Sequence, residues 1–311
     1  MNYRSLSAFT LGRLRDGVVV LFLVTLVIFV LGHVVGDPAS VMAPVDASQQ
    51  EIARLRQQLG LDRPFQEQFA SYFGSLIRGD FGQSLWQNRP ALTVVLEALP
   101  ATIVLTLAGL LIAGLGGSLL GILAGARPES RLDRAANFLS IVALSVPNFW
   151  LGLLLIVIVA VQLRALPTSG FSSWQSLILP AVTLGMIHGG RIFQLVRSVT
   201  FEEMTKPYAL VARSKGLPER LILWKHILRN IAVTMATTIG WEYVRMMGGA
   251  AFAIEVVFAW PGIGQLMIHA ASRQDFPVLQ AAVIVAGTFV IVTNGLVDLL
   301  YRHLDTRLRP A

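Results

Sequence analysis

Long apolar runs separated by short polar connections dominate the pattern of this chain. The runs cover residues 17–35, 98–126, 135–163, 165–190, 231–258 and 276–297. A helix that crosses a bilayer needs about 20 predominantly apolar residues, and each run is about that long or longer. The pattern therefore predicts an all-α membrane protein with six transmembrane helices.

The connections divide the chain further. Residues 1–35 form a predicted N-terminal segment with the first transmembrane helix, 36–97 a helical insert outside the membrane, 98–300 a five-helix core and 301–311 a tail. Within the insert, apolar residues recur at helical spacing over Ser48–Leu59 (Ile52, Leu55, Leu59) and Gln66–Ile77 (Phe69, Phe73, Ile77), and Gly79–Gly82 reads as a turn. The insert is either a cap packed on the spans or a cap that also touches an external partner.

The polar segment 201–230, between the fourth and fifth runs, holds every lysine of the chain: Lys206, Lys215 and Lys225. Proline fits the first turn of a helix and glycine its end, so the segment predicts a helix over Pro207–Lys215 that stops at Gly216. Pro218 then opens a second helix, with Leu221, Trp224 and Leu228 along one stripe. Such a hairpin is either a docking surface for a partner or an ordinary basic loop.

Breaks and small residues mark several runs. Pro147 interrupts the third run, and Pro180 with Gly185, Gly189 and Gly190 is expected to interrupt the fourth. In the second run, glycines stand at helical spacing at Gly114, Gly117, Gly121 and Gly125. Small residues let membrane helices approach closely, so these glycines predict tight helix packing.

Composition agrees with a membrane protein. Of the 311 residues 54% are hydrophobic and only 14% charged, whereas soluble chains carry about 25%, and the mean hydropathy is +0.65. Arginines cluster before the first run, between the second and third, within 191–229 and after the last run, and few lie in the opposite loops. The positive-inside rule then places both termini in the cytoplasm. This asymmetry explains the net charge of +7 without any nucleic acid.

A few ionisable residues lie inside the apolar runs, where they are functional candidates. Glu242 and Arg245 stand three apart and could pair, either as a structural pair or as part of a substrate pathway. His188 and Arg191 lie near the inner end of the fourth run, and Glu255 is expected to bond the Trp260-Pro-Gly turn. No spacing resembles a defined metal site.

The chain carries no motif for energy conversion or hydrolysis. The sequence Gly-x-x-x-x-Gly-Lys-Ser/Thr does not occur, nor do His-Glu-x-x-His and Gly-x-Ser-x-Gly, and there is no cysteine. ATP-driven transport would therefore need nucleotide sites on other subunits. The chain is not expected to be an enzyme or to hold a cofactor.

Several segments occur in the order and spacing of one family. They are Gly36-Asp-Pro-Ala39, Leu59-Gly-Leu-Asp-Arg-Pro64, Arg78-Gly-Asp-Phe-Gly82, Ser145-Val-Pro-Asn-Phe-Trp150, Tyr208–Gly216 with His226-Ile-Leu-Arg-Asn230, Val257–Gly264 and Leu304–Arg309. Over nearly its whole length the chain resembles the inner-membrane permease subunits of bacterial ATP-binding-cassette (ABC) importers, in the dipeptide, oligopeptide and nickel branch. The general permease loop starts with Glu-Ala-Ala, and this chain has Leu210, Val211 and Ala212 there, so that only Ala212 agrees.

The resemblance implies half of a translocation pathway in the bacterial inner membrane, with a second homologous permease, two ATP-binding subunits that bind ATP and Mg, and an extracytoplasmic solute-binding protein. It implies an ATPase-coupling helix at Tyr208, Ala209, Ala212, Arg213, Ser214, Lys215, Gly216 and Arg220. The small residues Ala209 and Ala212 would let this helix lie in a groove on a partner. Short peptides are the first expected substrate and nickel or a metal chelate the second, with glutathione-like or opine compounds also open. The alternative is a stand-alone secondary transporter or channel, whose ion-coupling site would be Glu242 with Arg245.

Overall fold

The structure is a computed structural model that describes residues 3–35, 48–58, 60 and 62–304. Gly36–Ala39, Leu59, Leu61 and the end of the chain from Asp305 lie outside these residues, so the expectations that involve them are not addressed. In the described residues the sole β pairing is the bridge between Gln83 and Pro90. The all-α expectation is confirmed.

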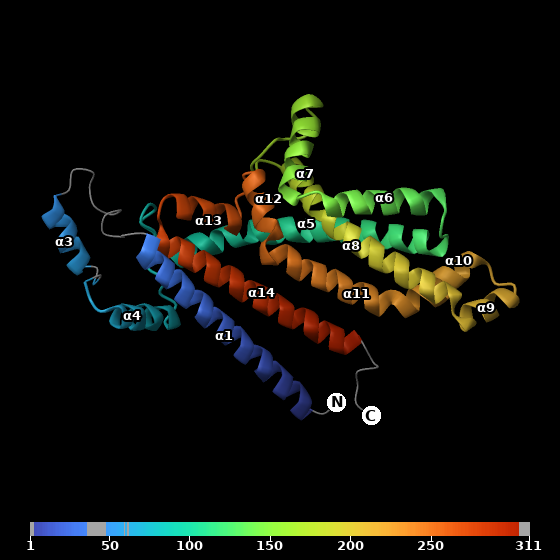
Figure 1. Cartoon of the computed structure of the whole chain (residues 1–311), viewed down its shortest axis with the longest axis horizontal. Helices are drawn as coiled ribbons and strands as arrows, with labels where there is room; N and C mark the ends of the chain where they lie inside the picture. The colour runs from blue at the N-terminus through green and yellow to red at the C-terminus, as the bar shows by residue number, and fades with distance from the viewer. Residues whose placement is uncertain (1–2, 36–47, 59, 61, 305–311) are drawn as a thin grey trace. The chain divides into compact units, whose positions relative to one another are not determined.

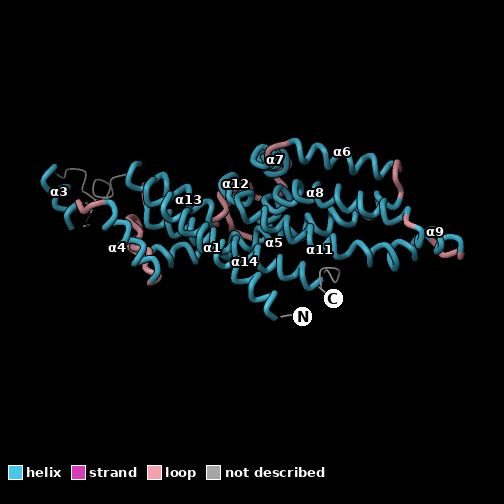
Figure 2. The backbone as a smooth tube through the Cα atoms, turned by 60° about the horizontal axis from the view of Figure 1, so that its bottom comes forward, coloured by secondary structure: helices cyan, strands magenta, loops and turns pink. Residues whose placement is uncertain are grey.

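Thirteen α-helices and four short helical segments of other pitch make up the described chain (Figures 1 and 2). The α-helices are α1 (Tyr3–Val35), α3 (Gln49–Gln58), α4 (Phe65–Ile77), α5 (Ala91–Ala126), α6 (Arg131–Ser145), α7 (Asn148–Leu155), α8 (Ile178–Thr205), α9 (Pro207–Ser214), α10 (Glu219–Leu221), α11 (Leu228–Arg245), α12 (Ala251–Val257), α13 (Ile263–Ser272) and α14 (Phe276–Leu304). The other four are η1 (Ile156–Gln162), η2 (Trp174–Leu177), η3 (Ile222–Ile227) and η4 (Met246–Ala250).

By length and composition, three helical stretches among the described residues can cross a membrane: α5, η2 with α8, and Phe276–Leu299 of α14. A fourth candidate is α6 followed by α7 and η1, which are bent by 109° at their junction. The bend falls at Val146 and Pro147, as the break expected at Pro147 requires. The count of six transmembrane helices stays a prediction.

The fourth run differs from expectation, because α8 is continuous from Ile178 to Thr205. Pro180 lies in the first turn, where a missing N–H leaves no hydrogen bond unmade. The expected interruption is therefore wrong. Gly185 and Gly190 serve close contact instead, since both are buried within the helix.

Glycines of α5 lie against α8, as the sequence predicts. A methyl group on Gly117 would come within 2.6 Å of the Gly189 carbonyl oxygen, and one on Gly121 within 2.8 Å of Val196 Cβ. On Gly125 it would come within 2.5 Å of the Arg197 carbonyl oxygen. The two helices can approach this closely only because these positions lack side chains.

The fifth run is a broken helix. Helix α11 continues into the π-helical η4 and then α12, and Gly249 at the break has φ 138°. Few residues other than glycine adopt that conformation. Backbone groups freed at membrane depth must be satisfied by protein or by a water-filled cavity.

The contacts divide the chain into two compact units. One comprises Ala101–Gly264 together with the chain from Val292 onward, and the other comprises Asn2–Pro100 with Gln265–Ile291. In the first unit a shared core joins α5, α8, α9, η3, α11 and α12, and α6 lies along α8 (Figure 1). The predicted division of the chain at residues 35, 97 and 300 stays a prediction.

In the second unit the insert forms a cap on the first helix. Phe22 and Phe29 of α1 contact Phe69, Phe73 and neighbouring aromatic rings of α4, with centroids 5.3–6.1 Å apart. The predicted apolar face of α4 is thus the one that packs, although Ile77 at its end is 72% exposed.

The turn expected at Gly79–Gly82 is present, and Asp80 Oδ1 accepts a hydrogen bond from the Gly82 N–H at 2.9 Å. Both glycines have a positive φ, 79° and 78°. Beyond the turn, the buried Asp275 accepts hydrogen bonds from the Ser84 hydroxyl at 2.5 Å and the Leu85 N–H at 3.2 Å. These contacts stay within the second unit and fix the connection into α5.

Candidate functional site

The hairpin between α8 and α11 contains the helix that the sequence predicts. Helix α9 begins at Pro207 and ends at Ser214, and Gly216 follows with φ 76°. The Leu217 N–H donates to the Ala212 carbonyl at 3.2 Å and the Gly216 N–H to that of Arg213 at 2.9 Å. This is the Schellman arrangement that a left-handed glycine permits after a helix. In Figure 1, α9 lies at the end of α8.

Arg213 fixes α9 to both of its neighbours. Its Nη1 donates to the Met204 carbonyl at the end of α8 at 3.0 Å, and its Nε donates to Glu219 Oε1 of α10 at 2.7 Å. The Arg213 guanidinium holds the pKa of Glu219 below its usual value. Arg213 is thus occupied within its own chain and stabilises the hairpin as one body.

A second set of contacts centres on Glu203. It accepts hydrogen bonds from the Tyr208 hydroxyl at 2.5 Å and from Lys206 Nζ, and it also bonds Asn230. Burial and the bond to Glu203 raise the pKa of Tyr208. Tyr208 and Glu203 therefore join the start of α9 to the end of α8 and the start of α11.

The faces of α9 differ from expectation. Ala209 and Ala212 were expected to face a groove on a partner, but both are buried in the core that includes Ile222 and Ile227 of η3. Their small size lets α9 lie close to its own chain. The exposed apolar residues of α9 are Leu210 and Val211, at 54% and 52%.

The remaining predicted coupling residues are at the surface. Ser214, Lys215, Gly216 and Arg220 are exposed, and the Ser214 hydroxyl donates back to the Val211 carbonyl at 2.9 Å. None of them forms an ion pair with another described residue.

Inside the apolar helices, four of the five expected pathway residues come together. Glu242 Oε2 lies 2.7 Å from His188 Nδ1 and 3.6 Å from Arg191 Nη1, and Arg245 Nη1 donates to Glu242 Oε1 at 2.7 Å. We call His188, Arg191, Glu242 and Arg245 the intramembrane cluster. The spacing of Glu242 and Arg245 in the sequence predicts their pair. That His188 and Arg191 of α8 lie beside this pair is seen only in the fold.

Burial within the intramembrane cluster is uneven. The side chains of His188 and Glu242 are 2% and 4% exposed, whereas those of Arg191 and Arg245 are 43% and 58% exposed. His188 Nε2 is buried and has no hydrogen-bond partner in the described part of the chain. No three His, Cys, Asp or Glu side chains in that part of the chain meet in a way that could hold a metal ion.

Glu255 lies apart from the cluster. It is fully buried, and its Oε2 accepts a hydrogen bond from the Gly264 N–H at 2.6 Å. Its carbonyl accepts the Trp260 N–H at 2.8 Å, and a methyl group on Gly262 would come within 2.2 Å of its Oε1. The expected bond to the Trp260-Pro-Gly turn is confirmed. Glu255 therefore stabilises the connection between α12 and α13.

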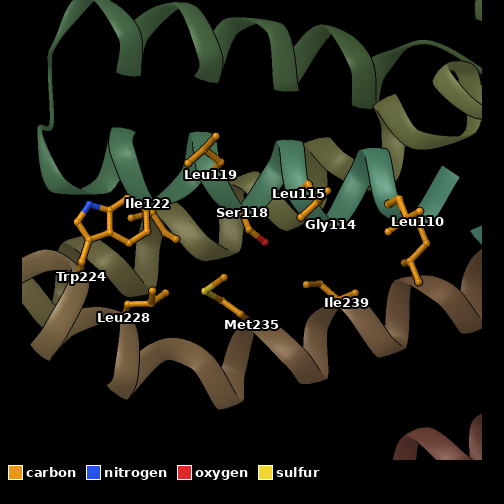
Figure 3. Close-up of a pocket in the computed structure, with 11 residues that line it drawn as sticks. Leu110, Gly114, Leu115, Ser118, Leu119, Ile122, Trp224, Leu228, Met235 and Ile239 are labelled. Carbon is orange, nitrogen blue, oxygen red and sulfur yellow. The ribbon is translucent and has the colours of Figure 1, made fainter. Parts of the chain in front are cut away.

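A separate apolar groove of about 420 Å³ runs between α5 and the helix formed by η3 and α11. Figure 3 shows Trp224 and Leu228 at one end and Ile239 further along, with Ser118 opposite. Trp224 and Leu228 belong to the predicted stripe and line the groove, whereas Leu221, the third residue of the stripe, does not line it. The polar side-chain groups that line the groove are the Ser118 hydroxyl and the Trp224 indole N–H, and no charged side chain of the described residues lines it, so the intramembrane cluster is the better polar site.

Sequence reasoning missed one ion pair that fixes α6 to α8. Arg197 donates to Asp133 through Nη2 at 2.8 Å and through Nε. Asp133 also accepts the Glu129 N–H, and its own N–H donates to the Ser130 hydroxyl, which caps α6. The Ser130-x-x-Asp133 spacing could have signalled the cap, but nothing in the sequence links Asp133 to Arg197.

Comparisons with known proteins agree with this fold. Residues 117–310 match the family described as binding-protein-dependent transport system inner membrane component, and residues 6–106 match the N-terminal part of that membrane component. The chain is 35% identical over 302 residues to the glutathione transport system permease protein GsiC of Salmonella typhimurium, covering 97% of this chain and 98% of GsiC. The identity to GsiC of Escherichia coli K12 is 34%, with the same coverage.

The fold is also that of a solved ABC transporter chain. A chain of the inward-facing MetNI methionine ABC transporter superposes with a TM-score of 0.54 at 16% identity, over 68% of this chain and 96% of the other. A second crystal form of it gives a TM-score of 0.56 at 17% identity.

The chain belongs to the family of binding-protein-dependent transport system inner membrane components. Within that family it is the multi-pass inner-membrane permease of an ABC importer, in the peptide and nickel branch. Such a permease works with ATPase and binding-protein subunits.

Proposed function

We propose that this permease forms half of a translocation pathway for short peptides, with glutathione as the first candidate. A second, homologous permease forms the other half, and both termini and α9 face the cytoplasm. The full-length similarity to permeases named for glutathione supports this substrate over nickel. The basic residues around α9, together with the positive-inside rule, support the orientation.

Coupling to ATP hydrolysis passes through α9. The single observation that carries this proposal is a short helix held to α8, α10 and η3 that still exposes Leu210 and Val211. A helix held so firmly moves as one body with the helices that follow it. Two ATP-binding subunits, each docked on the α9 of one permease, therefore tilt the membrane helices when they close. The permease itself does no chemistry, and Arg213 and Tyr208 act by holding α9 in place.

The experiment is reconstitution of the whole importer in liposomes with ATP inside and the binding protein added. We expect uptake of glutathione that needs both ATP and the binding protein. Flux through this chain alone, driven by an ion gradient, would support a secondary transporter and contradict the proposal. ATP-driven uptake of nickel but not of peptides would contradict only the substrate.

A further inference from the structure

The intramembrane cluster lies near the middle of its two helical stretches. The fourth helical stretch covers 174–205 rather than 165–190, so His188 and Arg191 lie midway along it and not near its inner end. Glu242 and Arg245 lie midway along 228–257, which contains the fifth predicted transmembrane helix. Ionisable groups at that depth are expensive and mark pathways rather than lipid-facing surfaces. Substrate sites of membrane transporters often lie near the midplane, beside broken helices. The break at Gly249 follows one turn after Arg245.

The charges of the cluster do not balance. Arg191 and Arg245 share the single carboxylate of Glu242, and neither contacts another acidic side chain in the described residues. With two guanidinium groups and one carboxylate, the cluster keeps a net positive charge, because arginine stays protonated in proteins. A cationic site at membrane depth favours an anion beside it.

The geometry leaves donors free for that anion. The side chain of Glu242 is buried, whereas those of Arg191 and Arg245 are 43% and 58% exposed. Arg245 uses one nitrogen on Glu242, and Arg191 approaches it only to 3.6 Å. Each guanidinium therefore keeps N–H groups that can bind a carboxylate in bidentate fashion.

We propose that Arg191 and Arg245 bind the carboxylate of the transported peptide during its passage. The proposal rests on the proposed function, in which peptides pass through this permease. Every free peptide carries a C-terminal carboxylate at neutral pH, and glutathione carries a further one. Glu242 positions Arg245 and competes with the substrate for both guanidinium groups. Binding is then weak enough for release, as conduction requires.

A protection experiment tests the site without relying on the natural substrate. The assembled complex is treated with phenylglyoxal, which modifies accessible arginines, in the presence of N-acetyl-trialanine or its C-terminal amide. Mass spectrometry follows modification of Arg191 and Arg245, with the exposed Arg164 as control. We expect the carboxylate peptide to slow modification of both arginines several-fold, the amide to leave it unchanged, and Arg164 to respond to neither.

Two outcomes overturn the proposal. Equal effects of the acid and the amide would show that the carboxylate is not recognised. If Arg191 and Arg245 do not react with phenylglyoxal in the complex, they are not accessible from the pathway. Because this experiment uses no ATP and no binding protein, its result stands even if reconstitution shows that glutathione is not carried.

Uptake by variants gives an independent measurement. Arg245→Gln removes charge-assisted hydrogen bonds, so glutathione uptake should fall about ten- to hundredfold. Arg245→Lys keeps the charge and should restore part of it, whereas Arg164→Gln should leave uptake intact. Co-purification of all subunits checks assembly of each variant. Wild-type uptake by Arg245→Gln would refute the carboxylate role, while absence of ATP-driven uptake in the unmodified complex would count against the proposed function alone.

Discussion

The exposed face of α9 gives the sharpest test of coupling. Leu210 and Val211 are 54% and 52% exposed on a helix whose other side is buried. Complete burial of such side chains is worth about 1.5–3 kcal/mol each. About half of each is still uncovered, so a docked ATPase that covers both gains about 2 kcal/mol, or about thirtyfold in affinity. Asp at both positions removes this gain and adds two carboxylates that must be desolvated.

The double variant Leu210→Asp/Val211→Asp should therefore lose the ATPase subunits during purification and lose ATP-driven uptake. The measurement compares ATPase retained per permease on a column and uptake in liposomes. Ile77→Asp is the matched control, because Ile77 is 72% exposed on another helix, α4, and undergoes the same substitution. A double variant that retains its ATPases and transports normally would refute docking through this face.

Three further results should follow from the local geometry. Gly216→Ala places a side chain at φ 76° and should destabilise the hairpin by about 1 kcal/mol, seen as faster hydrogen exchange at Leu217. Because Arg213 lowers the pKa of Glu219, their pair stabilises the hairpin above the ordinary pKa of Glu219 and loses this effect as pH falls through the lowered value. Glu219→Gln should thus speed exchange at Leu217 at pH 7, by the modest amount expected of an exposed pair, and match wild type in strong acid. Gly125→Val puts atoms 2.5 Å or less from the Arg197 carbonyl and should lower the thermal stability of the purified permease.

Patterns local in sequence predicted much of the fold. Apolar runs located the long helices, and Pro207 with Gly216 bounded α9 to within one residue. The glycines of α5 predicted its close contact with another helix. In each case the signal lies within a single stretch of helix, so no knowledge of distant residues is needed.

Orientation within the fold could not be predicted in the same way. Ala209 and Ala212 suggested contact with a partner because they are small, yet they are buried against η3, and Leu210 and Val211 are exposed instead. Small side chains permit close approach on any side of a helix. Which side packs depends on the course of the chain after Pro218.

The candidate site shows the same limit. The spacing of Glu242 and Arg245 predicted their pair, but His188 reaches Glu242 from a helix 54 residues away in the sequence. The interruption expected at Pro180 was wrong for a similar reason. A proline breaks a helix only when it lies in the helix interior. Helix α8 begins at Ile178, later than the apolar run suggested, so Pro180 lies in its first turn.

Cross-linking from α9 tests the central claim most directly. The chain contains no cysteine, so Leu210→Cys introduces a single thiol that can carry a photoreactive maleimide in a complex competent for transport. The account predicts an adduct between this position and an ATPase subunit, and none from Ile77→Cys. A working complex in which light joins position 210 to no ATPase would contradict it.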